Sequence, residues 1–420
     1  MKNYSLFCLF VTVIFSSCQE KKNSVELPKN TIQKEVIQLT NKDVNSEGVF
    51  LFTSKEEQLI SWTEHGENKK ETSLKLAFLN PITNAFEQPI IITPAKGLQL
   101  HAESMAKVGI TKKGVLYAVF RVKSKNSKSM YGGTVYYTTS TNKGGTWSEK
   151  QQLVADTTGT SQSYFDIAQL ANGTLGISWL DNRKLHKDRQ GQTLYFAKTD
   201  PTNTFQNKTA LEGSVCQCCR TDIEVGNNGT IQIAFRNLIA PTESGFPSIL
   251  ADKSTEVRDM YSTSSIDNGA TFSKASSIYA DNWQVNGCPH TGPSLATNTN
   301  ESGAVWFTDT ETNSGIFFKT NTSSNKKLIS KTGSHPQMVA ANSNYYIVYE
   351  EYYEVNKKGY TKIVMQEWNA SSMLKTTEIS VKKTNNDHAV IKAINSSQLV
   401  ISWINTDIKN AVIQYVIYDL

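Results

Sequence analysis

The sequence lacks a strong excess of charge of either sign and any hydrophobic run long enough to cross a bilayer. Its 43 lysines and arginines are offset by 38 aspartates and glutamates, and the formal charge of +5 is too small for a dedicated nucleic-acid-binding protein. The longest apolar run near the N-terminus, residues 6–15, has about half of the ~20 residues that a membrane-spanning helix needs. What is present, 38% apolar, 19% charged and 10% aromatic residues, is typical of a globular protein.

The N-terminus has the features of an export signal. Lys2 precedes the apolar run, and two serines come directly before Cys18. The segment Phe15-Ser-Ser-Cys18 resembles a bacterial lipobox, which implies that Cys18 is lipidated and holds the protein in the outer membrane of the cell envelope. Plain secretion is the alternative. We expect a signal peptide over residues 1–17, a tether over residues 18–33 and one folded domain over residues 34–420.

Seven similar strand patterns recur after residue 34, where apolar residues seldom show helical spacing. Each is an apolar run that ends in an aromatic residue and lies between turns rich in Gly, Asn, Ser and Asp. Successive aromatic markers lie between 43 and 71 residues apart, which suits one four-stranded propeller blade per repeat. The markers are Trp62, Phe120, Trp179, Phe235, Trp306, Tyr349 and Trp403.

The last repeat has room for only three strands. The segment Glu35-Val-Ile-Gln-Leu-Thr40 precedes the first repeat and would supply the fourth strand, so that no sheet edge stays open. We therefore predict an all-β fold with a single β-propeller of four-stranded blades, closed by the N-terminal strand. Seven blades are preferred, and six is the alternative if the weak first repeat is miscounted.

Two turns resemble the Asp-box, S-x-D-x-G-x-T-W, of the bacterial neuraminidase (BNR) repeats in sialidases and related propellers. They read Ser140-Thr-Asn-Lys-Gly-Gly-Thr-Trp147 and Ser265-Ile-Asp-Asn-Gly-Ala-Thr-Phe272. In such a turn a carboxyl or amide group accepts N–H groups, glycine supplies a positive φ and the aromatic residue packs underneath. The residues expected in these structural roles are Asn142, Gly144, Trp147, Asp267, Gly269 and Phe272.

A wider resemblance is to a bacterial group of sialidase-like, exo-alpha-sialidase-type proteins. It covers most of residues 48–420 and is carried by Arg258-Asp-Met-Tyr261, Cys216-Gln-Cys-Cys-Arg-Thr221 and Gly287-Cys-Pro-His-Thr-Gly-Pro293. The chain departs from sialidases in one motif, because its nearest match to F-R-I-P, Phe120-Arg-Val-Lys123, lacks the proline and comes a repeat late. The resemblance implies a glycoside hydrolase that needs no cofactor.

Polar residues begin the first strand of most repeats and follow the aromatic markers. In a propeller these positions lie around the central channel on one face, where ligand sites usually open. Several arginines at one opening would repel each other unless carboxylates or an anionic ligand, such as a glycan, were bound there. The alternative is that these residues only hydrate and pair around a water-filled pore. The expected substrate-binding residues are Arg121, Arg183, Arg220, Arg236, His101 and His335.

The resemblance also implies roles for these residues. A sialidase binds its substrate's carboxylate with three arginines from separate blades, and Arg121, Arg183 and Arg236 occupy equivalent positions in successive repeats. A carboxyl acid and a Tyr/Glu nucleophilic pair would complete the site. The candidate acids are Asp166, Asp181 and Asp222, and the candidate pair is Glu350 or Glu351 with Tyr352 or Tyr353.

The cysteines form a rival candidate site. Two of the six lie in the signal and at the lipidation position, which leaves four in an oxidising compartment. Three precede the first strand of one repeat, and the fourth precedes that of the next, two residues before a histidine. Thiolates with an imidazole suit zinc or copper, whereas two disulfides are the structural alternative. The residues concerned are Cys216, Cys218, Cys219, Cys288 and His290.

Two hypotheses follow. The first is an envelope lipoprotein whose propeller binds an anionic or other glycan in the arginine-lined funnel, with or without hydrolysing it. The second is a non-catalytic propeller whose Cys/His cluster binds a metal or is held by disulfides, and which binds a glycan or protein partner. Under both we expect a monomer that contacts the membrane only through its lipid and binds no nucleic acid.

Overall fold

The computed structural model describes residues 35–66, 71–124, 132–155, 161–184, 190–239, 256–285, 287–407 and 409–420. The expected signal peptide, the tether and Cys18 lie outside these ranges. The described residues form β-strands without any helix, so no helix among them is long and apolar enough to cross a membrane.

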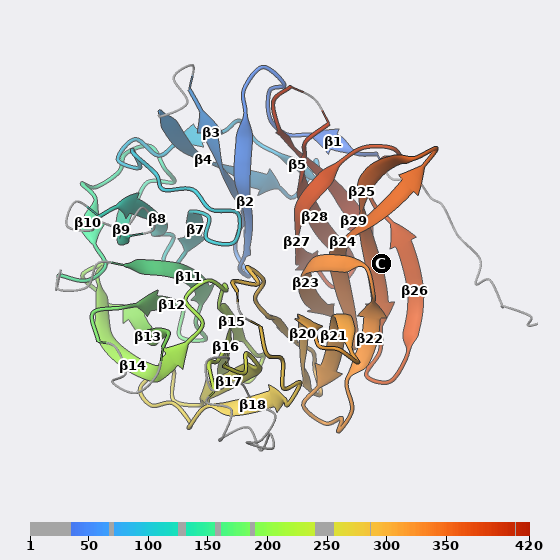
Figure 1. The fold of residues 1–420 in the computed structure, drawn as a ribbon. Helices are drawn as coiled ribbons and strands as arrows, with labels where there is room; N and C mark the ends of the chain where they lie inside the picture. Colours follow the sequence, from blue (N-terminus) through green and yellow to red (C-terminus); the bar gives the residue numbers. More distant parts are fainter. Residues whose placement is uncertain are drawn as a thin grey trace, which may run out of the picture.

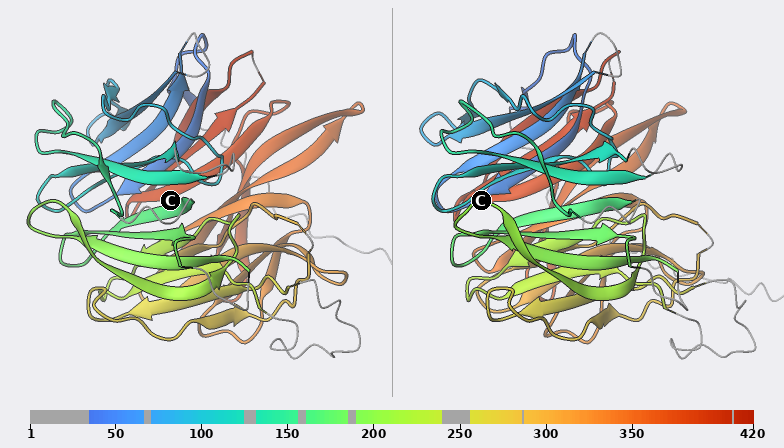
Figure 2. Two further views of the ribbon diagram at one scale, coloured as in Figure 1. Left: turned by 60° about the vertical axis from the view of Figure 1, so that its left-hand side comes forward. Right: turned by 90° about the vertical axis from the view of Figure 1, so that its left-hand side faces the viewer.

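The strands form seven antiparallel sheets that are arranged as blades around a central axis (Figure 1). The first strand of each blade lies at the centre, and the strands of a blade run between two faces of the molecule (Figure 2). The prediction of an all-β, seven-bladed propeller is therefore confirmed, and the six-bladed alternative is wrong.

The first four blades follow one another along the chain from residue 46. Blade 1 contains β2 (Ser46–Thr53), β3 (Gln58–His65), β4 (Thr72–Asn80), β5 (Ala85–Phe86) and β6 (Ile90–Ile91), and blade 2 contains β7 (Lys107–Ile110), β8 (Leu116–Lys123), β9 (Gly133–Ser140) and β10 (Gln151–Gln152). Blade 3 contains β11 (Gln162–Gln169), β12 (Leu175–Asp181), β13 (Gln192–Thr199) and β14 (Phe205–Val215), and blade 4 contains β15 (Asp222–Val225), β16 (Ile231–Arg236), β17 (Met260–Ser265) and β18 (Ser276–Tyr279).

The last three blades complete the ring. Blade 5 contains β19 (Ser294–Thr297), β20 (Ser302–Asp309), β21 (Ser314–Thr320) and β22 (Lys327–Ser330), and blade 6 contains β23 (Gly333–Ala341), β24 (Asn344–Val355), β25 (Lys358–Trp368) and β26 (Met373–Glu378). Blade 7 contains β27 (Asn386–Asn395), β28 (Gln398–Asn405), β29 (Val412–Asp419) and β1 (Ile37–Gln38).

The N-terminal strand closes the ring as predicted. In β1, Ile37 lies opposite Tyr415 of β29, and the Leu39 N–H donates to the carbonyl of Ile413 at 2.8 Å. The outer edge of the last three-stranded unit is thereby paired, which removes an exposed sheet edge.

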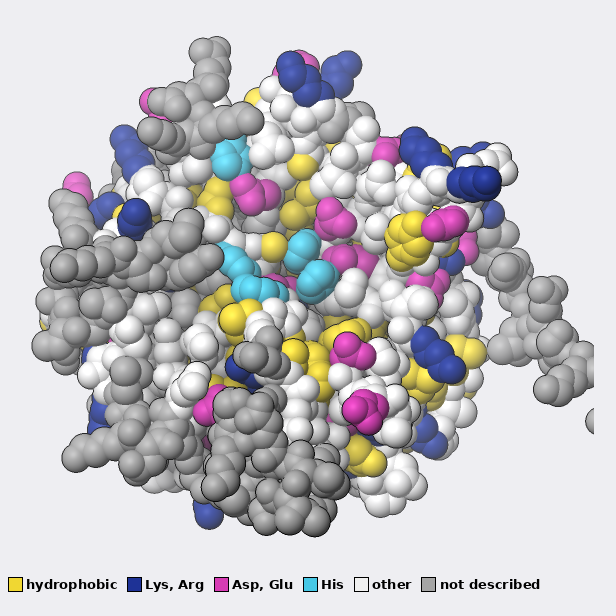
Figure 3. Space-filling model, in the orientation of Figure 1, with side chains coloured by type: hydrophobic (Ala, Val, Ile, Leu, Met, Phe, Trp, Pro, Cys, Tyr) yellow, Lys and Arg dark blue, Asp and Glu magenta, His cyan; other side chains and the backbone are white. Residues whose placement is uncertain are grey.

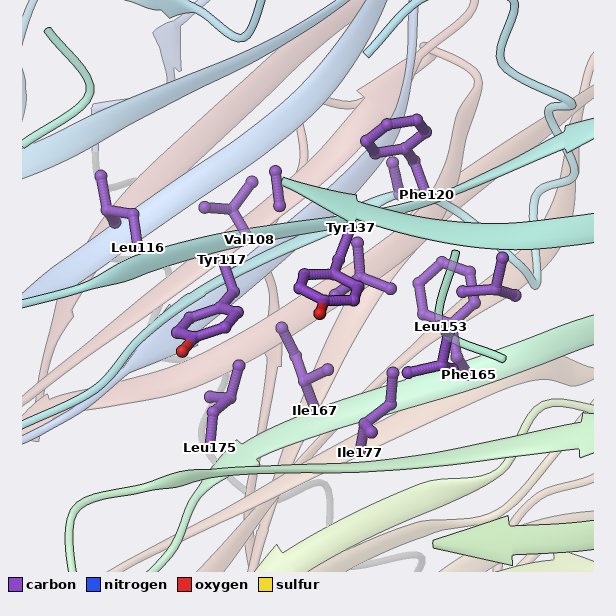
Figure 4. Packing of buried hydrophobic residues seen from close by; sticks show 14 of the residues in the cluster. Val108, Leu116, Tyr117, Phe120, Tyr137, Leu153, Phe165, Ile167, Leu175 and Ile177 are labelled. Atoms are coloured by element: carbon purple, nitrogen blue, oxygen red, sulfur yellow. The ribbon is translucent and has the colours of Figure 1, made fainter. Parts of the chain in front are cut away.

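The hydrophobic core lies between neighbouring blades. The seven aromatic markers lie on the second strands and are at most 2% exposed. In Figure 4, Val108 and Tyr117 of blade 2 face Ile167 and Leu175 of blade 3, and all four belong to one buried cluster. Burial of such side chains supplies the main stabilisation of the ring, at about 25 cal/mol per Å² of apolar area.

A β-bulge recurs near the start of the first strand in four blades. In each of these first strands, one residue directly follows the last regularly paired residue before the bulge. That residue has a positive φ, which is unfavourable for residues other than glycine. A bulge also turns a side chain away from the regular alternation of the strand. These residues are Gly48 (φ 66°), Tyr164 (φ 49°), His335 (φ 47°) and His388 (φ 53°), and His290, before β19, has a φ of 49°.

The two repeated turns have the hydrogen bonds expected from their residues. Asn142 Oδ1 accepts the Thr146 N–H at 2.9 Å, and Asp267 Oδ1 accepts the Thr271 N–H at 2.9 Å. The glycines of the two turns have φ values of 87° and 76°. These two glycines are Gly144 and Gly269. Trp147 packs against the core of blades 1 to 3, and the Phe272 ring lies against the ring of Phe196.

Candidate functional site

Histidine side chains gather around the centre of the face shown in Figure 3, beside acidic side chains. They come from blades 2, 5, 6 and 7 and form two ring pairs. The His335 and His388 rings are stacked with their centroids 4.5 Å apart. The His101 and His290 centroids are 5.3 Å apart. We call the opening that these four residues surround the channel mouth.

Glu350 of β24 holds the first histidine pair. Its Oε2 accepts a hydrogen bond from His335 Nδ1 at 2.9 Å, and its Oε1 accepts the backbone N–H of His388. Burial lowers the pKa of His335, but the hydrogen bond to Glu350 and the charge of that carboxylate outweigh burial, so the pKa is raised overall. The buried carboxylate therefore fixes the position of both histidines.

Glu103, in the segment before β7, connects the two histidine pairs. Its backbone N–H donates to His101 Nδ1 at 3.1 Å, and its carboxylate lies within 4.8 Å of ring nitrogens of His335 and His388. Arg220 donates to Glu103 Oε2 at 2.5 Å. Burial raises the pKa of Glu103, but the charges of Arg220 and the histidines outweigh it and hold the pKa below its ordinary value. Glu103 is therefore an ionised carboxylate at the channel mouth.

The second histidine pair lies against Tyr164. The Tyr164 ring meets the His101 ring edge-on, with the centroids 5.7 Å apart. Burial lowers the pKa of His101, and the neighbouring His290 lowers it further. Because His101 Nδ1 accepts the Glu103 N–H, the neutral ring carries its proton on Nε2. His290 is exposed. The pair therefore offers one imidazole N–H donor and one accessible imidazole.

Arg220 and Arg236 make internal hydrogen bonds. Besides Glu103, Arg220 contacts the carbonyl of Pro336, next to the bulge of blade 6, at 2.6 Å. Arg236 is 1% exposed and stacks on Trp283 at 4.7 Å. Its guanidinium donates to the carbonyl oxygens of Arg258, Thr291 and Phe307. These contacts favour structural roles for both arginines.

The other two predicted arginines lie in blades 2 and 3. Arg183 lies over the Tyr195 ring at 4.2 Å, and its Nε is 3.5 Å from the carboxylate of Asp181. Burial raises the pKa of Asp181, which also accepts the Arg183 backbone N–H. Arg121 is buried, and burial lowers its pKa to about 10. After burial and His290, the positive charge of Arg121 is a smaller cause of the lowered pKa of His101.

Asp166 and Asp222 link the first strands of neighbouring blades. Asp166 accepts the Ile223 N–H at 2.9 Å and pairs with Lys107 at 2.6 Å, while Asp222 accepts the Leu295 N–H at 2.5 Å. Burial and the nearby Asp166 raise the pKa of Asp222 to about 6. Both carboxylates line a channel cavity of about 300 Å³ between the first strands, together with Lys107, Arg220, Glu224 and Lys392.

The predicted nucleophilic pair lies on the hairpin of β24 and β25. Glu351 pairs with Lys362 at 3.1 Å. Tyr352 is exposed and donates to Glu354 at 2.8 Å, while the hydroxyl of Tyr353 accepts the backbone N–H of Lys383. These contacts place the tyrosines among residues of the hairpin and of the segment before blade 7.

The cysteines are separated into two groups. The thiols of Cys216, Cys218 and Cys219 are buried, and Cys216 Sγ lies 3.4 Å from Cys218 Sγ and 3.5 Å from Cys219 Sγ. Cys288, by contrast, is exposed. The His290 ring contacts His101. All four described cysteines are free, so neither of the expected disulfides is present among them. Arg258 donates to Cys216 Sγ at 3.0 Å. Hydrogen bonds from the two other thiols, with the charge of Arg258, hold the pKa of Cys216 well below its ordinary value.

Two residues of the channel mouth, Glu103 and Tyr164, were not identified by the sequence analysis. Glu103 precedes a short first strand by a loop, so its position was not marked by strand alternation. Tyr164 has a positive φ, which tyrosine does not signal in the way glycine or asparagine does. Neither Glu103 nor Tyr164 therefore carries a signal in the sequence that marks it as a residue of the channel mouth.

No family model and no curated protein sequence matches the chain. Among solved structures, an ulvan lyase described as a polysaccharide lyase is similar over 92% of this chain and 96% of its own, with 10% identity and a TM-score of 0.54. The same kind of lyase bound to -[GlcA(1-4)Rha3S]- matches over 90% and 94% of the two chains, with 11% identity and a TM-score of 0.53. The Hadza microbial sialidase Hz136 matches over 86% and 76%, with 10% identity and a TM-score of 0.45. At these identities the similarity to the two lyase structures shows the fold alone.

Proposed function

We propose that the protein binds an acidic polysaccharide at the channel mouth and cleaves it by proton transfer, as a polysaccharide lyase. The observation that carries the proposal is the pair of His101 and His290, which places an imidazole N–H donor beside an exposed imidazole. The candidate carboxyl acids accept internal hydrogen bonds or are paired, which supports imidazole chemistry over a two-carboxyl hydrolase. These acids are Asp166, Asp181, Asp222 and Glu350.

The chemistry requires a glycan that contains a uronic acid. His290 removes the proton at C5, next to the carboxylate, while the His101 N–H and the positive charge of Arg121 stabilise the negative charge that develops on that carboxylate. The C4–O bond then breaks, the electron pair of the C–H bond forms a C4=C5 double bond, and the imidazolium of His290 returns a proton to the leaving oxygen. The ulvan lyase with the same fold is bound to a glycan containing GlcA, which supports a substrate of this class.

The test is incubation of purified protein with GlcA-containing polysaccharides. We expect an ultraviolet-absorbing product, because the new double bond is conjugated with the carboxylate, and a rate at least about a hundredfold lower for His290→Asn. The matched control is His65→Asn, which removes a histidine in blade 1 that pairs with Glu47. New reducing ends without ultraviolet absorption would indicate hydrolysis instead, and no cleavage of any polymer would contradict the proposal.

A second candidate function is metal binding at the three buried cysteines. It is favoured by the Sγ atoms of Cys216, Cys218 and Cys219, which lie within 4.8 Å of one another. Three thiolates suit zinc or Cu(I). We expect about one equivalent of metal in purified protein and three further reactive thiols after denaturation with a chelator. Metal-free protein whose Cys218→Ser variant is equally stable and binds neither ion would exclude this site.

We also propose that Cys18 carries a lipid, on the basis of the lipobox-like segment alone. The expected result is incorporation of labelled fatty acid into the wild-type chain and its loss, with release from the membrane fraction, in Cys18→Ser. Unchanged membrane association in Cys18→Ser would contradict lipidation.

A further inference from the structure

We propose that Glu103, His335 and His388 bind one divalent cation at the channel mouth. One carboxylate oxygen and one nitrogen from each ring lie within 4.8 Å of one another, although the three residues belong to blades 2, 6 and 7. Two imidazoles and a carboxylate suit borderline cations such as Zn²⁺, Fe²⁺, Co²⁺ and Ni²⁺. This site goes beyond the proposed lyase activity, because cation binding is measured without a glycan.

Glu350 supplies the supporting contacts that such a site requires. In histidine ligands, the N–H of the second ring nitrogen usually donates a hydrogen bond to a carboxylate. This hydrogen bond fixes the ring and leaves the other nitrogen free for the metal. His335 Nδ1 is 2.9 Å from Glu350 Oε2, so Nε2 is the nitrogen with the free lone pair. The same carboxylate accepts the backbone N–H of His388 and thereby holds the second ligand.

The backbone presents both histidines in the same unusual conformation. His335 and His388 each follow the last regular pair before a bulge, with φ values of 47° and 53°. Such values are costly for residues with a side chain, and they concentrate at functional sites. Here they bring the two rings together from adjacent blades, at 4.5 Å and an interplanar angle of 25°.

The local charge also favours a cation. Three acidic side chains lie close together here, those of Glu103, Glu350 and the neighbouring Asp387. Arg220 supplies one positive charge and forms an ion pair with Oε2 of Glu103. Oε1 of Glu103 is thereby left for a second cation.

The position of the site leaves room for exchangeable ligands. The side chains of His335 and His388 are 27% and 22% exposed, while that of Glu103 is 4% exposed. Three protein ligands do not fill the coordination sphere of a borderline cation, so water or an anionic ligand would complete it.

The experiment is a Co²⁺ titration of the purified mature chain without glycan, followed by calorimetry and visible absorption. We expect one Co²⁺ per chain with the weak bands of nitrogen and oxygen ligands, distinct from the intense thiolate-to-cobalt absorption that the cysteines would give. His335→Asn and His388→Asn should each weaken binding at least tenfold. Asparagine is chosen because it tolerates a positive φ better than alanine.

Two further variants separate ligand loss from general damage. Glu350→Gln, which removes a positioning residue, should weaken Co²⁺ binding by about 10- to 100-fold. His65→Asn should bind Co²⁺ as the wild type does, and circular dichroism and urea unfolding show whether each variant folds. A wild-type chain that binds no Co²⁺ at millimolar concentration, binding that is unchanged in both histidine variants, or a purely thiolate-type spectrum would each overturn the proposal.

Discussion

Arg236 is surrounded by main-chain carbonyls in the interior of blade 4. It donates to three of them and stacks on Trp283. Its removal leaves buried acceptors without donors, each of which costs about 1–3 kcal/mol. We therefore expect Arg236→Ala to lower the free energy of unfolding by about 3 kcal/mol or more in a urea titration.

Lys143→Ala is the matched control, because this cation is 73% exposed and pairs with Glu57 at the surface. Its effect should stay within about 0.5 kcal/mol. If Arg236→Ala kept full stability and lost only glycan binding, the arginine would be a ligand residue, as the sialidase resemblance implies.

Glu224 makes the stability of the channel depend on pH. Burial raises its pKa from 4.5 to about 7, while its carboxylate accepts the Thr297 N–H at 3.1 Å. Because the folded-state pKa is the higher one, folding favours the protonated form, and stability falls as the pH rises from about 4.5 to about 7. Glu224→Gln keeps the acceptor and removes the charge.

We expect Glu224→Gln to stabilise the protein at pH 8 by about 1 kcal/mol. This value is smaller than the free energy that the full pKa shift would correspond to, because the side chain is partly exposed to the channel. At pH 4 the variant and the wild type should be equally stable. Urea unfolding at both pH values measures the difference, and a variant that is less stable at pH 8 would contradict the raised pKa.

The repeated turns show how an element depends on a single glycine. Gly269 has a φ of +76°, and a Cβ atom there would lie 2.4 Å from the Phe196 ring, whereas Gly97 has a φ of +69° with open space around it. Both Gly→Ala variants incur the cost of the positive φ, about 1–2 kcal/mol. Only Gly269→Ala also displaces a core aromatic residue.

We therefore expect Gly269→Ala to lower the melting temperature clearly more than Gly97→Ala. Thermal unfolding by circular dichroism measures both. Equal losses in the two variants would show that backbone conformation alone explains the effect and that Phe196 moves without cost.

At the scale of the element, sequence patterns predicted the strands well and the bulges poorly. The markers from Trp62 to Trp403 were found because each second strand is an apolar run that ends in an aromatic residue and lies between recognisable turns. Bulges at Tyr164, His335 and His388 depend on pairing with the next strand, and none of these three residues is the glycine that most often marks a positive φ.

Ring closure by β1 matters for the whole molecule. Without this strand, β29 would present an open edge in blade 7. We expect a chain that starts at residue 41 to be less stable to urea by several kcal/mol than one that starts at residue 19, and to elute as larger species in size-exclusion chromatography. Equal stability of the two chains would show that three strands suffice for blade 7.

The candidate site was harder to predict than the fold because it exists only in the closed ring. Sequence reasoning named His101, His335 and Glu350 from their positions at strand starts and after the aromatic markers. It could not show that Glu103 of blade 2 lies against the histidines of blades 6 and 7, since these residues are more than 200 positions apart. It also could not distinguish a guanidinium that faces a ligand from one that binds carbonyls, as Arg236 does.

The pairing of β1 with β29 also has a mechanical consequence. A pulling force on the chain before residue 35 acts on these inter-strand bonds first, because they are the first ones along the described chain. The register has Ile37 and Gln38 paired, followed by the bond from Leu39 to Ile413, so few bonds carry the load. Tension from the lipid proposed for Cys18 would therefore open the ring at blade 7 before it reached the channel mouth.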